Sequence, residues 1–285
     1  MANYKGHFKS LPGTSGVISK DCIDGDKTMQ DSSFIVIRQF IKRVRKTVSK
    51  FNGSCTWHFS QVENPVAGII GSLPESRRGI CEMLAARWIE RHAHNSSLAS
   101  WLSTSGSIEK NDINPSKIRQ IMQQFIVTYT LKSGLILESN SGDVNQESSI
   151  DLWLGRHGIL QLRNINYSWA GRYKFNEEQT RSDIRENMSK GDYARDIAIN
   201  VQRDLHNCHY GNYALIRIFG FSGHAMAAWI AQDACFFDPN FGEFYFSDKN
   251  TFINWFPYFF LASPYSLPIV GLSEWYENCF YAPCR

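Results

Sequence analysis

The chain has 285 residues, of which 43% are hydrophobic and 14% aromatic, so it is long and apolar enough to fold around a sizeable core. Its formal net charge is only +3, and the basic excess lies in the first 80 residues, which carry twelve Lys and Arg against six Asp and Glu. This small and local surplus argues against a nucleic-acid-binding protein.

Targeting segments are not expected from the sequence. Residues 1–13 are polar and lack the apolar stretch of a secretory signal peptide. The longest apolar candidate, Trp255–Ala262, is short and is interrupted by Pro257. The sequence therefore predicts no transmembrane helix.

The seven cysteines are odd in number and follow no repeated spacing, which is atypical of a small disulfide-stapled domain. We interpret most of them as reduced core residues. Some metal-binding residue types do lie close together, namely His206, Cys208 and His209, and separately Cys279 and Cys284. Neither group has the paired C-x2-C spacing of a zinc site, so we predict no metal and no cofactor.

The N-terminal part divides into two segments. Residues 1–33 are rich in Gly, Ser, Asp and Lys, which predicts a flexible arm. Residues 34–75 follow as a basic amphipathic helix, expected over Phe34–Lys50 from its helical apolar spacing, and a connector. The polar face of this helix carries six Lys and Arg and no acid. That face is either simply solvated or contacts an anionic membrane surface or an acidic partner.

Residues 76–285 read as one domain with helices first and strands second. Helices are expected over Ile80–His92, from Pro115 onward, and over most of Arg181–Leu205. After Gly211 the chain consists of short aromatic and β-branched runs separated by Gly, Asp and Asn, which predict strands. These runs cover residues 213–219, 224–230, 235–238, 243–246 and 275–281, with a helix near 251–260. This order predicts the α+β class.

Cys81 opens the first of these helices. It follows Gly79 and Ile80 and begins an apolar stripe that continues through Leu84 and Trp88. A helix N-terminus offers unpaired N–H groups and a partial positive charge, and both favour the nucleophilic thiolate. A cysteine in such a stripe is also a common small core residue, so this position indicates catalysis only together with a base.

Two further residues supply such a base and its partner. His224 starts an apolar strand after Gly223, and Asp238 follows Phe237 at the end of the next strand. Taken singly, they are also typical of a structural histidine and a turn-capping aspartate. If the hairpin loop has three residues, 231–233, Asp238 becomes a diagonal neighbour of His224 on the same face. A two-residue turn would place the two on opposite faces, so an odd-length loop or a bulge is required.

Three stretches, Gly79–Trp88, Gly223–Ala225 and Phe237–Phe244, together resemble the YopT/AvrPphB family of papain-like cysteine proteases, which bacteria inject into host cells. The order Cys, His, Asp and the His-to-Asp spacing also agree, and the resemblance covers residues 76–285. It implies a papain-like cysteine protease fold. In that fold, a helix that begins at the cysteine packs on an antiparallel sheet that carries the histidine and the aspartate.

The resemblance also implies roles for single residues. Cys81 would be the nucleophile, His224 the general base and acid, and Asp238 the residue that orients the imidazole. Such enzymes hold the oxyanion with the cysteine N–H and a side-chain amide a few residues before the cysteine. Here the residue five positions before is Ser76, so we expect its hydroxyl to take this role, or another loop to supply the donor.

The tripeptide Gly25–Lys27 resembles the site at which some members from plant-associated bacteria remove their own N-terminal segment. This predicts self-cleavage after Lys27. The alternative is a plain turn within a flexible arm.

The resemblance thus implies an effector protease that is secreted into a host cell and cleaves host proteins in the host cytoplasm through a thioester acyl-enzyme. The resemblance implies a small GTPase or a signalling kinase as substrate, and the basic helix would suit peripheral contact with an anionic membrane. Two alternatives stay open. One is a glutamine deamidase or transglutaminase that acts on host GTPases with the same triad, and the other is a non-catalytic binding module on this fold.

Overall fold

The computed structural model describes residues 38–76, 80–106, 112–138, 149–162, 169–172, 198–199, 201–203, 205–206, 211–219, 223–267, 270 and 274–282. For residues 129–138, 169–172 and 274–277 only the backbone is described. The predicted arm at residues 1–33 and the predicted cleavage site after Lys27 lie outside the described residues. So do Gly79, Cys208, His209 and Cys284.

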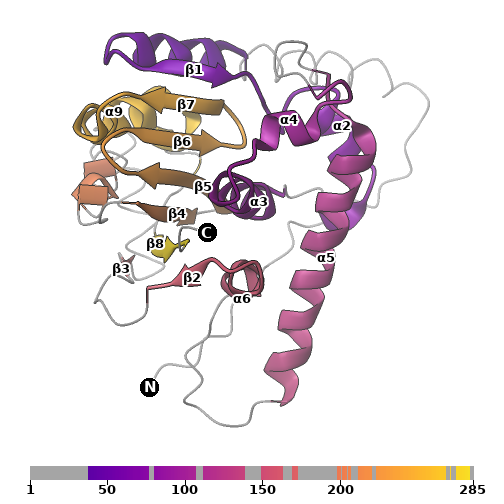
Figure 1. Ribbon diagram of the computed structural model, residues 1–285. Coiled ribbons are helices and arrows are strands. Elements are labelled where there is room, and N and C mark those ends of the chain that lie inside the picture. The colour runs from indigo at the N-terminus through magenta and orange to yellow at the C-terminus, as the bar shows by residue number, and fades with distance from the viewer. Residues whose placement is uncertain are drawn as a thin grey trace, which may run out of the picture. The chain divides into compact units, whose positions relative to one another are not determined.

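An antiparallel sheet of eight strands lies at the centre of the described part of the chain (Figure 1). The strands run in the order β1-β7-β6-β5-β4-β8-β2, and β3 also pairs with β8. Successive hairpins join β4 to β7, so strands that are adjacent in sequence lie side by side in the middle of the sheet. The strands are β1 (Ser54–Trp57), β2 (Leu160–Gln161), β3 (Trp169–Arg172), β4 (Asn212–Phe219), β5 (Gly223–Ile230), β6 (Ala234–Asp238), β7 (Gly242–Phe246) and β8 (Glu274–Tyr281).

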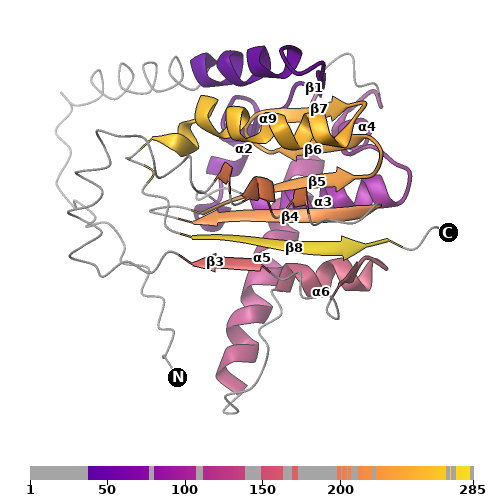
Figure 2. The same ribbon diagram turned by 90° about the vertical axis from the view of Figure 1, so that its left-hand side faces the viewer.

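Helices cover both faces of the sheet. Figure 2 shows α9 over one face, with α3 and α5 behind the strands on the other. Residues 38–49 are also helical. The labelled helices are α2 (Val66–Gly71), α3 (Cys81–Ala93), α4 (Leu98–Leu102), α5 (Pro115–Glu138), α6 (Ser149–Arg156) and α9 (Lys249–Ala262), with short 3-10 turns η2 (Pro74–Ser76) and η3 (Pro264–Ser266).

Alternation along β6 explains why the sheet needs a helical layer on each side. Phe236 points to α9, where its ring centroid lies 5.0 Å from that of Phe259. The next residue, Phe237, points the other way and stacks on Trp88 of α3 at 6.1 Å and on Trp57 of β1 at 5.9 Å. Both phenylalanine rings are fully buried, so the strand contributes to two cores at once.

The basic helix predicted from the sequence is present over the described residues 38–49. Its apolar stripe, Ile41, Val44 and Val48, is buried as the helical spacing requires. Thr47 fixes the helix to α9, because its hydroxyl accepts a hydrogen bond of 2.8 Å from the indole N–H of Trp255. The apolar face therefore belongs to the fold, whereas Lys42, Arg43 and Lys46 on the basic face are exposed to solvent.

The α+β class is confirmed, and α3 begins at Cys81 as predicted. The start of a helix at Pro115 is confirmed as well. The connector after β1 differs from the prediction, because it contains the short helix α2. Val66 and Ile70, four residues apart, bury one side of that helix. None of the helices in the described part of the chain is long and apolar enough to span a bilayer.

Candidate active site

Cys81 is the first residue of α3, at the edge of the packed helical layer. Ile80 occupies the N-cap position, with a non-helical backbone at φ −119° and ψ 24°. Among the described residues, no side chain forms a capping hydrogen bond to this helix start. The Ile80 carbonyl accepts the first helical hydrogen bond, 2.9 Å from the Leu84 nitrogen. The Cys81 thiol is free and half-buried, so it lies at a helix N-terminus within reach of solvent.

The hairpin between β5 and β6 has the three-residue loop that the triad interpretation demanded. Ile230 pairs with Ala234 and Ala227 pairs with Phe237, which leaves residues 231–233 as the loop. Of the two loop lengths that the sequence left open, the structure has the one that the triad interpretation requires. It places His224 and Asp238 on one face of the sheet as diagonal neighbours.

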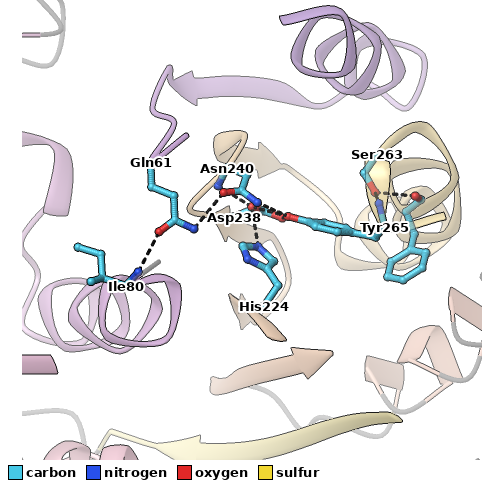
Figure 3. Close-up of polar contacts among 8 residues, drawn as sticks. Gln61, Ile80, His224, Asp238, Asn240, Ser263 and Tyr265 are labelled. Carbon is cyan, nitrogen blue, oxygen red and sulfur yellow. Dashed lines mark hydrogen bonds and ion pairs between the residues drawn. The ribbon is translucent and has the colours of Figure 1, made fainter. Parts of the chain in front are cut away.

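His224 and Asp238 are in direct contact. The imidazole Nε2 lies 3.0 Å from the Asp238 carboxylate Oδ1 (Figure 3). Burial alone would lower the pKa of His224. The charge of Asp238, the hydrogen bond to it, and the hydrogen bond and charge of Cys81 outweigh burial and raise this pKa from 6.5 to about 10. The structure thus brings His224 into direct contact with Asp238, and Cys81 is near enough to contribute to the raised pKa of His224.

The Asp238 carboxylate is fully buried and surrounded by donors. Its Oδ1 accepts a hydrogen bond of 2.7 Å from the Asn240 backbone N–H, and its Oδ2 accepts one of 2.9 Å from the Tyr265 hydroxyl. The Tyr265 ring also stacks on the His224 imidazole, with centroids 4.9 Å apart and planes 28° apart. Both oxygens of this buried carboxylate therefore have hydrogen-bond donors.

Gln61 joins this site to the start of α3. Its side-chain Oε1 accepts a hydrogen bond of 3.3 Å from the Ile80 backbone N–H, one residue before Cys81. Its Nε2 donates to Asn240 Oδ1 at 2.9 Å, and its backbone N–H donates to the Pro239 carbonyl at 2.7 Å. Figure 3 shows the Gln61 amide bridging the gap between the helix and the sheet.

Ser76, the expected oxyanion donor, is fully buried. Its hydroxyl lies 2.8 Å from the Ile70 carbonyl oxygen and 3.1 Å from that of Leu73, so its single hydrogen is engaged within the η2 turn. A hydroxyl in this position closes the end of α2. The geometry therefore does not support the role that we expected for Ser76, since its donor is already used.

Sequence reasoning gave no role to Gln61 or Tyr265, and it noted Asn240 only as part of a motif. These polar residues carry no periodic signal, and two of them lie far from Cys81 in sequence. A metal site is a separate question. Within the ranges that the structure describes, no group of three or more His, Cys, Asp or Glu side chains is arranged to hold a metal ion. His206 is described, but its predicted neighbours Cys208 and His209 are not.

Chemically, the site combines the Cys81 thiol, the protonated imidazole of His224 and the buried carboxylate of Asp238. A thiol at the start of a helix and a neighbouring imidazole are the groups that covalent catalysis by cysteine uses. The carboxylate holds the imidazole in one tautomer and one orientation, because its Oδ1 is bonded to Nε2. The Nδ1 side of the ring is then left to exchange protons with the sulfur and with a reacting group.

Comparisons with known proteins point the same way. Residues 45–269 match the peptidase family described as the Yersinia/Haemophilus virulence surface antigen. The chain is 30% identical over 243 residues to the cysteine protease yopT1 of Yersinia enterocolitica, covering 84% of this chain and 68% of that protein. It is 30% identical over 224 residues to the cysteine protease YopT of Yersinia pestis, covering 78% of this chain and 62% of that protein.

The solved structure of the Pseudomonas avirulence protein AvrPphB is also similar to this chain, with 14% sequence identity and a TM-score of 0.44. The similarity covers 70% of this chain and 90% of the AvrPphB chain. The family match spans more than half of the chain and includes all three candidate catalytic residues. This protein therefore belongs to the peptidase family described as the Yersinia/Haemophilus virulence surface antigen and is a cysteine protease related to YopT.

Proposed function

We propose that this protein cleaves peptide bonds of host proteins, with Cys81 as nucleophile, His224 as proton carrier and Asp238 as the orienting carboxylate. The observation that carries the proposal is the placement of the imidazole. Its Nε2 is hydrogen-bonded to a buried carboxylate, and Cys81 at the start of α3 is near enough to help raise the pKa of His224. Nucleophile, base and orienting group are thus in the order that covalent catalysis requires.

In the acylation step, the Cys81 sulfur attacks the carbonyl carbon of the scissile peptide bond. The C=O π bond opens to an oxyanion, and the imidazolium of His224 gives its proton to the departing amine as the C–N bond breaks. A thioester and a neutral imidazole remain. In deacylation the imidazole takes a proton from water, the hydroxide attacks the thioester, and the thiolate leaves as the imidazolium re-forms.

For the oxyanion we propose the Cys81 backbone N–H together with the Gln61 side-chain amide, in place of Ser76. The Gln61 amide lies beside the helix start, because its Oε1 accepts from the Ile80 N–H. One hydrogen on Nε2 is used by Asn240, and an amide nitrogen carries two. The second hydrogen is suited to the developing negative charge.

We further propose that the protein acts as an effector inside a host cell, since the Yersinia proteins that it resembles are cysteine proteases of this family. A small GTPase or a signalling kinase remains the proposed substrate class. A glutamine deamidase or transglutaminase would form its thioester with a glutamine side chain and release ammonia in place of a peptide; water then takes the acyl group in a deamidase, and an amine takes it in a transglutaminase. A non-catalytic module would leave Cys81 without function.

Proteomics of new protein termini in host cells tests the proposal. Cells expressing the wild type are compared with cells expressing Cys81→Ala, and with Cys55→Ala as a matched control at another partly buried thiol. We expect new termini with the wild type and with Cys55→Ala, and none with Cys81→Ala. Termini that persist in Cys81→Ala would contradict the proposed nucleophile. Deamidated or cross-linked glutamines without new termini would favour the alternative enzyme.

Self-cleavage after Lys27 is proposed from the tripeptide Gly25–Lys27 and from the proposed protease activity. The purified wild type is expected to lose residues 1–27, whereas Cys81→Ala keeps them. Intact-mass measurement of both proteins distinguishes these states. Two identical full-length masses would contradict the idea.

The basic face of the helix at residues 38–49 is proposed to contact an anionic membrane surface. Lys42, Arg43 and Lys46 are exposed on it, and residues 38–50 contain no acid. Each such cation adds about 1 kcal/mol of attraction to an anionic surface. Co-sedimentation with phosphatidylserine vesicles should be lost when all three are changed to Glu and kept in Arg156→Glu. Equal binding to neutral phosphatidylcholine vesicles would contradict this proposal.

A further inference from the structure

A continuous line of hydrogen bonds runs from the backbone beside Cys81 to the Asp238 carboxylate (Figure 3). It begins at the Ile80 N–H, which donates to Gln61 Oε1 at 3.3 Å, and continues from Gln61 Nε2 to Asn240 Oδ1 at 2.9 Å. Asn240 Nδ2 then donates to the Tyr265 hydroxyl oxygen at 3.0 Å, and that hydroxyl lies 2.9 Å from an Asp238 oxygen. The line connects the helical layer to the sheet.

The Ile80 N–H determines which group donates and which accepts in every hydrogen bond of this line. A backbone N–H can only donate, so the Gln61 amide must turn its oxygen to Ile80 and its nitrogen to Asn240. The Asn240 amide must then turn its oxygen to Gln61 and its nitrogen to Tyr265. Because the Tyr265 oxygen accepts from Asn240, its own hydrogen is directed to the Asp238 carboxylate.

Tyr265 is held in place independently of this line. It lies in the η3 turn, where its backbone N–H donates to the Ser263 hydroxyl oxygen at 3.3 Å, and Ser263 in turn donates to the Phe260 carbonyl at 2.7 Å. Burial and the Asp238 charge raise the pKa of Tyr265 well above its usual value of 10, so the phenol keeps its proton. The hydroxyl is thus a rigid donor at neutral and alkaline pH.

Among the described residues, Tyr265 is the donor to Oδ2 of Asp238 at 2.9 Å, and its hydroxyl oxygen also lies 3.2 Å from Oδ1, which accepts from His224 and Asn240 as well. We propose that Tyr265 is a positioning residue that holds the Asp238 carboxylate with Oδ1 toward His224, and that Asn240 and Gln61 set the direction of its hydroxyl. This proposal rests on the proposed roles of Cys81, His224 and Asp238. Without the hydroxyl, a buried carboxylate oxygen would lack this donor, and the carboxylate would turn away from the imidazole.

The test uses Tyr265→Phe, which keeps the ring that stacks on His224 and removes only the hydroxyl. The matched control is Tyr258→Phe, a tyrosine on α9 that is 57% exposed. The probe is iodoacetamide, which needs no known substrate. The alkylation rate of Cys81 is read from the tryptic peptide Gly79–Arg87 by mass spectrometry. Burial raises the pKa of Cys235 to about 12, so that thiol reacts slowly and serves as an internal reference.

We expect Tyr265→Phe to lower the Cys81 alkylation rate by about tenfold, because the Cys–His pair loses its fixed geometry. In an Asp238→Asn background the same change should alter the rate by less than about twofold, since Tyr265 acts through the carboxylate. Tyr258→Phe should leave the rate unchanged. Equal losses in both backgrounds would overturn the proposal, because Tyr265 would then act without Asp238.

A second readout separates positioning from a general loss of structure. Iodoacetate carries a negative charge that the His224 imidazolium attracts, so its rate of reaction at Cys81 falls at high pH as that imidazolium loses its proton. In Tyr265→Phe we expect this fall to move to lower pH by about one unit. The proposal would be overturned if the iodoacetate rate of Tyr265→Phe fell at the same pH as that of the wild type or at a higher pH.

If Tyr265→Phe does not fold, Asn240→Ala replaces it, since this variant keeps the phenol and removes the donor that directs it. It should lower the alkylation rate in the same direction, and an unchanged rate would overturn the proposal. Failure of the proposed function looks different. In that case wild-type Cys81 would react no faster than it does in urea-unfolded protein. If wild-type Cys81 does react faster, but Tyr265→Phe leaves its rate unchanged, only the positioning role of Tyr265 is contradicted.

Discussion

His224 Nε2 lies 3.0 Å from Oδ1 of Asp238, and the Asp238 side chain is fully buried while that of His224 is 9% exposed. The pair is therefore shielded from water, which strengthens the attraction between the carboxylate and the imidazolium. The contact that we propose to orient the base also links protonation of His224 to the stability of the fold.

The first prediction concerns this linkage. The folded-state pKa of His224 is raised to about 10 from 6.5, so the native state binds more protons than the unfolded state between these values. The stabilisation is complete below pH 6.5 and is lost as the pH rises toward about 10. Urea unfolding of the wild type and of Asp238→Asn should show a gap in unfolding free energy that shrinks over this range. A gap that is constant from pH 6.5 to 10 would contradict the assigned interaction.

The second prediction compares the two oxyanion candidates. Gln61→Ala should lower the rate of substrate hydrolysis by about 10²–10³, the usual cost of one oxyanion donor. It should change alkylation by iodoacetamide far less, because that reaction forms no oxyanion. Ser76→Ala should keep the hydrolysis rate and lose about 1 kcal/mol of stability through its buried hydrogen bond. The reverse pattern, with hydrolysis lost only in Ser76→Ala, would return the role to Ser76.

Much of the sheet could be predicted because its signals are local. The two strands of the β5–β6 hairpin follow from short apolar runs, whereas the loop length stayed open and the structure fixes it at residues 231–233. The start of α3 at Cys81 follows from one apolar stripe. These elements depend on residues within a few positions of one another.

The line of hydrogen bonds from Ile80 to Asp238 could not be predicted, because its members are distant in sequence. Gln61 lies 19 positions before Ile80, and Tyr265 lies 27 positions after Asp238, so only the folded chain brings them together. Single Gln and Tyr residues carry no spacing signal. The expectation for Ser76 relied on its distance from Cys81 along the chain. In the fold that segment forms the end of α2 and η2, and the loop after β1 reaches the helix start instead.

The third prediction concerns Arg217 on β4, which ties the first turn of α3 to α6. Its guanidinium lies 2.7 Å from Glu82 Oε1 and 2.9 Å from Asp151 Oδ1, and both Arg217 and Asp151 are buried. Arg217→Met would leave the Asp151 carboxylate buried without this cation, which costs about 3–5 kcal/mol. The control is Arg38→Met.

Arg38 is 72% exposed and lies 3.5 Å from Glu63, so its loss should cost less than about 1 kcal/mol. Urea titration gives both values from the shift of the unfolding midpoint. Because Glu82 follows Cys81, Arg217→Met should also slow iodoacetamide alkylation. A stability loss similar to that of Arg38→Met would show that the buried cluster contributes little.

The last prediction concerns Gly242, where the hairpin after Asp238 passes close to β1. Its φ is +107°, and a Cβ placed there would lie 2.2 Å from the Trp57 carbonyl oxygen. Gly242→Ala therefore combines backbone strain with a clash against main chain, and we expect a loss of more than about 3 kcal/mol. Gly155→Ala in α6 meets nothing within 4 Å and should be neutral or stabilise by up to about 1 kcal/mol.

The effect of Gly242→Ala should extend to the site, because Gly242 pairs with Asp238 and β1 leads directly to Gln61. Any shift of β1 away from the new methyl group would displace the Gln61 amide from Asn240 and from the Ile80 N–H. At a temperature where the variant is still folded, hydrolysis should therefore fall more than thermal stability alone explains. Unchanged hydrolysis in the folded variant would mean that the loop after β1 can move without disturbing the oxyanion donor.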